Sequence, residues 1–274
     1  MTDLRPPTAR SRTAARVGLR LLPAVPFAGL LVVWVVTWAV ARPSLATFPS
    51  LTQVLQTLGD LIESGELWRN IVASMGRWAI ALVTATLSGV GLGLLAGLSA
   101  VVARIVEPLA IFFTAMSGII WLPLAIVWFG LGTGMIVFVI WNSMFFVIFS
   151  NTLLGVRSVP GVLEDAIRTL GGSRLQIVTQ VVLPGAFAHV LAGMRAGLGF
   201  GWRALLAAEI IGATAGLGAM IFRATDFLRS DVIVAGILVI GTIGLTIDRA
   251  LLAPIERRTI ERWGMVSATR RRLG

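Results

Sequence analysis

The hydrophobic positions of this chain lie in long uninterrupted runs, not in the short alternating patterns of a soluble fold. Four stretches, 21–41, 78–103, 108–156 and 232–247, contain no charged residue. A helix needs roughly 20 apolar residues to cross a hydrocarbon core about 30 Å thick. Runs of this length therefore predict an all-α membrane protein that crosses the bilayer several times.

Dividing these runs into helix-length segments predicts about six transmembrane helices. The run 108–156 is too long for one crossing, and Gly130, Gly132 and Gly134 divide it into two. An even number of spans places both termini on the same side of the membrane. The expected spans are 23–41, 70–100, 105–129, 135–154, 187–212 and 232–252.

The arginines are distributed unevenly across this topology. All 23 basic residues are arginine, and fifteen of them fall on the side that carries both termini, against four on the other side. Positive residues concentrate in cytoplasmic segments, so both termini are predicted to be cytoplasmic. The same bias accounts for the net charge of +10 without a nucleic-acid partner.

The expected organisation is a cytoplasmic Arg-rich leader at 1–22, a transmembrane domain at 23–252 and a cytoplasmic basic tail at 253–274. Cleavage after Ala41 as a signal peptide is the rival interpretation of the first run, but the run exceeds a usual signal core. After Ser50, apolar residues at helical spacing predict an amphipathic helix lying in the outer interface, and Gln53 completes a capping box.

Several absences exclude most enzyme classes. The chain has no Cys and no Lys, and its one histidine is His189. Thiolate chemistry, a lysine-dependent phosphate-binding loop and a histidine-rich zinc site are therefore ruled out. The chain is not expected to be an enzyme or to bind a metal or another cofactor itself.

The loop between the fourth and fifth spans, 155–186, predicts two short helices. The first has Pro160 in its first turn, where the missing N–H costs nothing. Gly171 and Gly172 end it, because glycine accepts the left-handed conformation that closes a helix. Ser173 and Gln176 begin the second with a capping box, and Leu183-Pro184 is expected to close it. A helix of ~11 residues is about 16 Å long and suits insertion into a groove on another protein. Its apolar face is formed by Leu163, Ala166, Ile167 and Leu170, and its charged face by Glu164, Asp165 and Arg168.

This loop resembles that of a known family. The stretch Asp165-Ala166-Ile167-x3-Gly171-x9-Val181-x-Leu183-Pro184 is similar to the E-A-A-x3-G-x9-I-x-L-P loop of binding-protein-dependent ABC importer permeases. Asp165, Ile167 and Val181 depart from that pattern by mild exchanges. Flanking segments, over roughly 25–265, look like the nitrate/sulfonate/taurine branch; they include Trp121-Leu122-Pro123-Leu124, Trp202-Arg203-x4-Ala208-Glu209 and Gly216-Leu217-Gly218.

The resemblance implies a type I ABC importer permease of the cytoplasmic (inner) membrane, working by alternating access. It implies two copies of an ABC ATPase subunit, which would bind ATP and Mg, a second permease chain and an extracytoplasmic solute-binding protein. The implied cargo is a small anion such as a sulfonate, taurine or nitrate. The loop would dock on the ATPase subunit through Glu164, Asp165, Ala166, Ile167, Arg168, Gly171, Leu183 and Pro184.

Polar and charged residues inside spans are costly and mark candidate path residues, here Asn142, Trp202, Arg203 and Glu209. Arg203 offers a fork of donors to an anion. Its alternative role is a structural ion pair with Glu209 or with a charge on another chain. Glu209 lies ~9 Å further along the same helix on another face, so pairing within one helix is poor, and pairing across a dimer stays open. Glu209 itself is a structural or gating candidate. Asn142 either bonds across helices or lines the path.

Two features complete the sequence-based interpretation. Glycines recur every four residues at 89, 93 and 97 and again at 193, 197 and 201, which predicts close helix packing. The alternative function is a secondary transporter or channel that works without an ATPase. Such transporters are built from internal repeats, and no convincing repeat relates the two halves of this chain.

Overall fold

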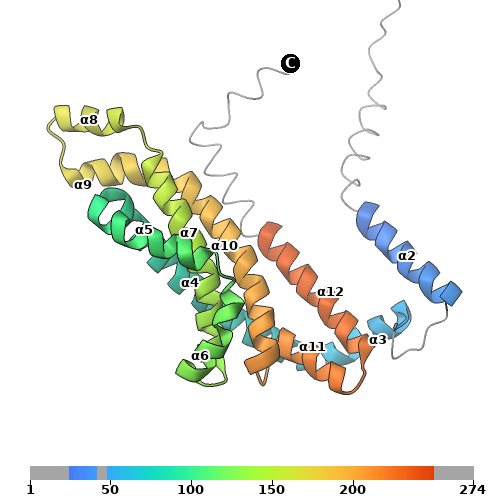
Figure 1. The fold of residues 1–274 in the computed structure, drawn as a ribbon. Helices are drawn as coiled ribbons and strands as arrows, with labels where there is room; N and C mark the ends of the chain where they lie inside the picture. The colour runs from blue at the N-terminus through green and yellow to red at the C-terminus, as the bar shows by residue number, and fades with distance from the viewer. Residues whose placement is uncertain (1–24, 42–47, 250–274) are drawn as a thin grey trace, which may run out of the picture.

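A computed structural model describes residues 25–41 and 48–249, and within those ranges the chain forms helices and turns without strands (Figure 1). The expected leader at 1–22 and tail at 253–274 lie outside the described residues. In chain order the elements are α2 Val25–Ala41, α3 Leu51–Glu63, α4 Glu66–Leu98, α5 Ala100–Thr114, η2 Gly118–Trp121, α6 Leu122–Phe129, α7 Thr133–Arg157, α8 Gly161–Thr169, α9 Arg174–Ile177, η3 Val178–Val182, α10 Leu183–Gly212, α11 Leu217–Asp226 and α12 Ser230–Ile247.

The all-α membrane class is confirmed. Four helices in the described part are long and apolar enough to cross a membrane: Glu66–Leu98, Thr133–Arg157, the continuous Arg174–Gly212 and Ser230–Ile247. A bent pair of helices makes up to a fifth span, and the apolar part of α2, Ala28–Val40, is shorter. Apolar run length therefore located the membrane-crossing part of the chain.

The third expected span, 105–129, is wrong as a single straight helix. The chain bends by 94° between α5 and the segment Gly118–Phe129. At the bend, Gly118 lies against Ser143 of α7, so closely that a Cβ at this position would collide with the serine side chain. Pro123 then stands at the start of α6, where its missing N–H costs nothing. A glycine contact followed by a helix-starting proline thus divides this span.

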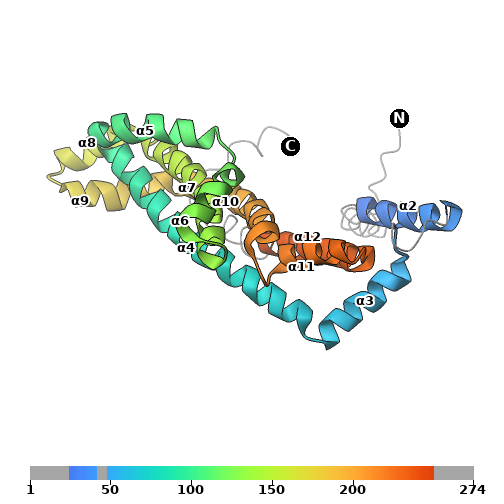
Figure 2. The same cartoon turned by 60° about the horizontal axis from the view of Figure 1, so that its bottom comes forward.

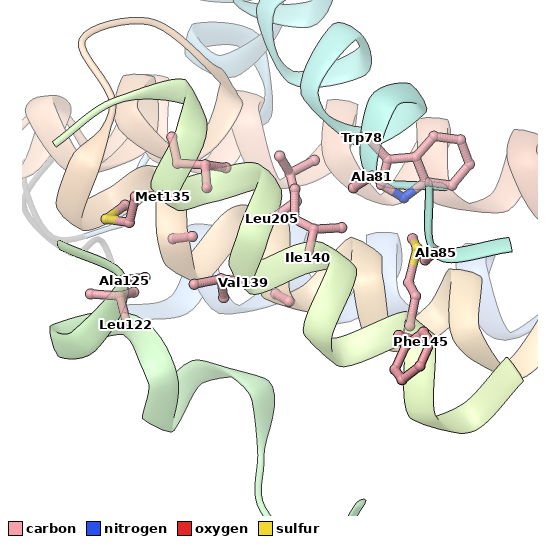
Figure 3. Packing of buried hydrophobic residues seen from close by; sticks show 14 of the residues in the cluster. Trp78, Ala81, Ala85, Leu122, Ala125, Met135, Val139, Ile140, Phe145 and Leu205 are labelled. Carbon is pink, nitrogen blue, oxygen red and sulfur yellow. The ribbon is translucent and has the colours of Figure 1, made fainter. Parts of the chain in front are cut away.

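The core is built where α7 lies between α4 and α10. Figure 3 shows buried side chains of α7, from Met135 to Phe145, among those of α4, α6 and α10. The glycine faces pack as predicted: a Cβ at Gly93 would lie 2.6 Å from the Thr152 Cβ, and one at Gly193 would lie 2.6 Å from the Asn151 Cβ. Both partners belong to α7, so the two glycine faces bring α4 and α10 close to it.

The amphipathic helix expected after Ser50 is α3. The Ser50 hydroxyl accepts from the Gln53 N–H, but the Gln53 Oε1 is buried without a partner, so only half of the capping box forms. The apolar side of α3, including Val54 and Leu61, packs on residues of α11 and α12. Its helical conformation is confirmed, whereas its position in the membrane interface stays a prediction.

The 155–186 loop lies at the opposite end of the bundle from α3 and α11 (Figure 1). It contains α8 and α9 as expected, but Leu183-Pro184 does not close the second helix. That helix continues through the π-turn η3 into α10, as one 39-residue helix from Arg174 to Gly212. The Leu183 N–H bonds to the Val178 carbonyl five residues back, which widens the turn just before Pro184. A widened turn accommodates the proline ring without breaking the helix.

Candidate functional site

Helix α8 presents an exposed surface at the end of the bundle. None of its residues is buried. Val162 is 71% exposed, and Leu170 just after the helix is 87% exposed. Ile167 turns inward and packs against a small cluster that includes Val156 and Ile177. The helix is therefore attached to the bundle through one side, and its other side is open to a partner.

The turn between α8 and α9 has a fixed geometry. Gly171 has φ +78, a left-handed conformation that favours glycine. A Cβ at Gly172 would collide with the Ile167 side chain. The Ser173 N–H donates to the Gln176 Oε1 at 2.6 Å, and the Gln176 N–H donates to the Ser173 hydroxyl, so this capping box is confirmed. These contacts set the direction in which α8 points.

The charged residues of α8 differ in exposure. The Arg168 guanidinium is 3.7 Å from the Glu164 carboxylate, one helical turn away. Asp165 is exposed, and its backbone carbonyl accepts from the Thr169 hydroxyl at 2.8 Å. Asp165 is therefore open to a docking partner. Glu164 is 31% exposed and Arg168 65% exposed, and both also line a cavity between α8 and the bundle. Leu183 and Pro184 lie on the continuous helix that follows the loop.

Two of the candidate path residues, Asn142 and Arg203, meet at one cavity. It has a volume of roughly 270 Å³ and lies between η2, α7 and α10. The Arg203 guanidinium carbon is 5.4 Å from the centre of the Phe200 ring, a cation–π contact that orients the side chain. The remaining polar lining comes from Thr114, Ser117 and Ser143. One guanidinium with amide and hydroxyl groups is a suitable lining for a small anion.

Arg203 also lines a second cavity, of roughly 230 Å³, between α4, α10 and α12. Trp202, another candidate path residue, lies here, and its ring meets that of Trp78 edge-on at 6.4 Å between centroids. Near the α12 end of the cavity, the Arg195 guanidinium is 3.3 Å from the Asp248 carboxylate. The Arg203 side chain thus lines both cavities.

Glu209 does not line either of these cavities. Its side chain is fully buried, and both carboxylate oxygens lie 2.8 Å from the Ser74 hydroxyl. The Arg77 Nη1 donates to the Glu209 carboxylate at 2.8 Å, and the Gly218 N–H donates to the same carboxylate at 3.0 Å. The ion-pair partner of Glu209 is therefore Arg77 of α4 and not Arg203.

The same region caps the N-terminus of α11. The Gly216 N–H donates to the Asn70 side chain and the Leu217 N–H to the Ser74 hydroxyl, each at 2.8 Å. With the Gly218 bond to Glu209, three successive amides at a helix N-terminus find side-chain acceptors. Arg77 also donates to the Ala215 carbonyl at 2.6 Å. We call this set, Asn70, Ser74, Arg77, Glu209 and residues 215–218, the Glu209 cluster.

Sequence reasoning found Glu209 but missed Asn70, Ser74 and Arg77. The signal was present, because positions 70, 74 and 77 follow the spacing of one helical face. Among the residues that the structure describes, no group of three or more His, Asp or Glu side chains is arranged to hold a metal. The candidate site is therefore made of an exposed loop helix, an arginine between two cavities and a buried carboxylate cluster.

Comparison with known proteins provides evidence that is independent of this geometry. Residues 89–259 match the family described as "Binding-protein-dependent transport system inner membrane component". The taurine transport system permease protein TauC of Escherichia coli is 38% identical over 84% of this chain and 85% of its own length. The putative aliphatic sulfonates transport permease protein SsuC of Bacillus subtilis is 30% identical over 88% and 86%.

Two further matches are more distant in sequence. The nitrate import permease protein NrtB of Leptolyngbya laminosa is 28% identical over 76% of this chain and 77% of its own length. Among solved structures, an inward-facing form of the MetNI methionine ABC transporter superposes with a TM-score of 0.53 at 20% identity, covering 68% of this chain and 95% of the other. At that identity the likeness concerns the fold alone.

Proposed function

Because this chain belongs to the family of binding-protein-dependent transport system inner membrane components, we propose that it is the permease of an importer for a small anion, driven by a separate ATPase subunit. In this proposal α8 docks on the ATPase, and the cargo passes Arg203. Two permease chains and two ATPase chains form the complex, and an extracytoplasmic binding protein delivers the cargo. ATP and Mg are bound by the ATPase, and both termini of this chain are cytoplasmic.

The observation that carries the proposal is the exposed amphipathic helix α8. Leu163 and Leu170 are exposed at one end of the bundle, and Gly171 with the Ser173 capping box holds the helix in one direction. An exposed amphipathic helix is a common element for insertion into a hydrophobic groove. The family supplies the partner, an ATPase whose closure would push on α8.

The continuous helix from Arg174 to Gly212 supports a mechanical route from that loop to the path. Its 39 residues span about 58 Å, and Arg203 lies about 44 Å from its start. The helix begins next to α8, passes both cavities and ends in the Glu209 cluster. A displacement of α8 would therefore move Arg203 relative to α7 and α12, as alternating access requires.

An anionic cargo is supported by Arg203 itself. The residue is exposed in the single chain although it lies within a helix that is long and apolar enough to cross a membrane. A guanidinium is too costly to face lipid there, so it must face a water-filled path or a second chain. A guanidinium fork matches the oxygens of a sulfonate, nitrate or carboxylate. The relatives named for taurine, sulfonates and nitrate favour the first two as cargo.

The proposal is tested by Gly171→Leu, with Gly59→Leu as its matched control. A leucine at φ +78 is strained and turns α8 away from its position, whereas Gly59 is a helical glycine with open space around it. We expect Gly171→Leu to abolish ATP-driven taurine uptake and ATPase copurification while membrane insertion stays normal. The control should retain both.

Two results would contradict this assignment. One is normal uptake by Gly171→Leu. The other is transport at full rate by proteoliposomes that contain this chain alone, which is the behaviour of a secondary transporter or channel. Taurine, methanesulfonate and nitrate should be compared as cargoes, because the binding protein does most of the selection.

A further inference from the structure

Two cavities at the α8 end of the bundle share one residue, Arg157. The first, of roughly 250 Å³, lies between α8, α9 and the ends of α4 and α7, and Arg157, Arg168, Arg174 and Glu164 are its charged lining. The second, of roughly 270 Å³, is a groove between α5 and α7. Its lining is Glu107, Arg157, Ser150 and the apolar side chains Ala110, Ile111, Phe149, Leu153 and Leu154. A polar recess and an apolar groove thus meet at one guanidinium.

The charges around Arg157 leave one positive charge in excess. Arg157 donates to both oxygens of Glu107, each at 2.8 Å, and Arg168 lies 3.7 Å from Glu164. The lining of the two cavities together contains three arginines and these two carboxylates. A ligand group with a single negative charge, placed near Arg174, would balance the recess.

We propose that these cavities together bind one anionic phospholipid of the membrane leaflet on the α8 side. The phosphodiester occupies the recess between Arg157 and Arg174, and an acyl chain lies in the groove between α5 and α7. Figure 2 shows α5 beside α7, with α8 and α9 at the same end of the bundle, so headgroup and chain would occupy adjacent places. Recess and groove fit an amphiphile, whereas a free anion would use only the recess.

The membrane position favours a lipid as the occupant. Arg157 is the last residue of a membrane-crossing helix, and the groove extends from it along that helix. Interfacial arginines attract anionic lipids with about 1 kcal/mol each. A zwitterionic headgroup brings no net charge to balance the excess. The lipid would fill the space under α8 and hold the loop against the ends of α4 and α7.

The proposal is independent of the cargo and is tested by binding. The full chain is purified in detergent, together with any ATPase that copurifies, and is titrated with phosphatidylglycerol or phosphatidylcholine in native mass spectrometry. We expect one tightly retained phosphatidylglycerol per chain and no comparable phosphatidylcholine. Arg174→Gln should weaken phosphatidylglycerol binding about fivefold. Arg69→Gln, which removes an exposed arginine at the other end of α4, should leave it unchanged.

Thermal unfolding separates a lipid from a free anion. Phosphatidylglycerol should raise the Tm of the wild-type chain and raise that of Arg174→Gln less, while inorganic phosphate at the same concentration has no effect. Equal retention of the two lipids, or an equal loss of binding in Arg69→Gln, would overturn the site. An equal Tm rise with inorganic phosphate would make the recess an anion site without a lipid. None of these results depends on uptake.

Discussion

Arg77 of α4 and Glu209 of α10 form an ion pair of 2.8 Å in which the carboxylate is fully buried and the arginine side chain is 10% exposed. Each member of the pair makes further hydrogen bonds. The Ser74 hydroxyl and the Gly218 N–H donate to Glu209, and Arg77 donates to the Ala215 carbonyl. A buried carboxylate with this many partners fixes the relative positions of α4, α10 and α11. We therefore interpret Glu209 as a structural residue of the bundle, and a direct role in the path stays a prediction for Asn142, Trp202 and Arg203.

This interpretation predicts that Glu209→Gln lowers the stability of the chain. Glutamine keeps the shape of the side chain but leaves the Arg77 charge without its counterion. Breaking one side of a buried pair costs about 3–5 kcal/mol. The expected result is a clear fall in Tm of the detergent-purified chain. The double variant Arg77→Met/Glu209→Leu should recover part of that loss, because it removes both charges.

The matched control for this prediction is Glu107→Gln, which breaks the exposed pair with Arg157. Both side chains of that pair are more than a third exposed, and exposed pairs contribute about 0–1 kcal/mol. Its Tm should therefore change little. If Glu209→Gln has an unchanged Tm but loses uptake, Glu209 acts in the translocation path and is not a structural residue.

A second prediction concerns the glycine face between α4 and α7. Gly93→Ala places a Cβ 2.6 Å from the Thr152 Cβ, so the two helices must separate. Gly91 lies on the same helix with open space at the corresponding position. We expect Gly93→Ala to destabilise the chain by about 1–3 kcal/mol, the usual effect of overpacking. Gly91→Ala should be neutral or stabilising by up to about 1 kcal/mol.

Chemical unfolding of both variants under the same conditions provides the measurement. The two substitutions add the same methyl group to the same helix, so any difference between them reports the contact with α7. Equal stability of the two variants would show that the packing of α4 on α7 is looser than the structure has it.

The sequence predicted the membrane-crossing part because apolar run length is a local property. A helix in lipid must satisfy its own backbone, so a run of sufficient length identifies it without knowledge of its neighbours. The glycine faces were predicted for a similar reason, since spacing along one helix suffices. The bend before Gly118 was missed because the contact that accompanies it is made with Ser143, which is distant in the sequence.

The continuity at Pro184 was missed for a different reason. Proline usually ends a helix, and only the five-residue bond from Leu183 to Val178 shows that this one is accommodated. Similarly, the spacing of Asn70, Ser74 and Arg77 marks a polar face on α4 but does not identify what it contacts. Their partners at 215–218 lie more than a hundred residues away. Local patterns identified the elements, and the contacts between elements had to come from the structure.

The third prediction tests Arg203 as the residue that contacts cargo. Arg203→Ala removes the one cationic side chain that the described residues contribute to the cavity lined by Asn142. If an anion passes there, uptake of taurine should fall at least tenfold, since a charge-assisted contact contributes about 1.5–3 kcal/mol. Arg203→Lys keeps the charge but loses the fork, so its uptake should be intermediate. ATPase copurification and Tm should remain at the wild-type level in both variants.

Arg195→Gln is the control for Arg203→Ala. It tests whether the loss of any positive charge from α10 reduces uptake, or only the loss of the charge that contacts cargo. Arg195 lies on the same helix but pairs with Asp248, and it is absent from the lining that Asn142 shares. Its loss should change uptake less than the loss of Arg203. If the two variants reduce uptake equally, or if Arg203→Ala leaves it unchanged with an intact complex, the anion does not pass at Arg203. In that case the guanidinium meets a second permease chain, and crosslinking from position 203 in the assembled complex would identify its partner.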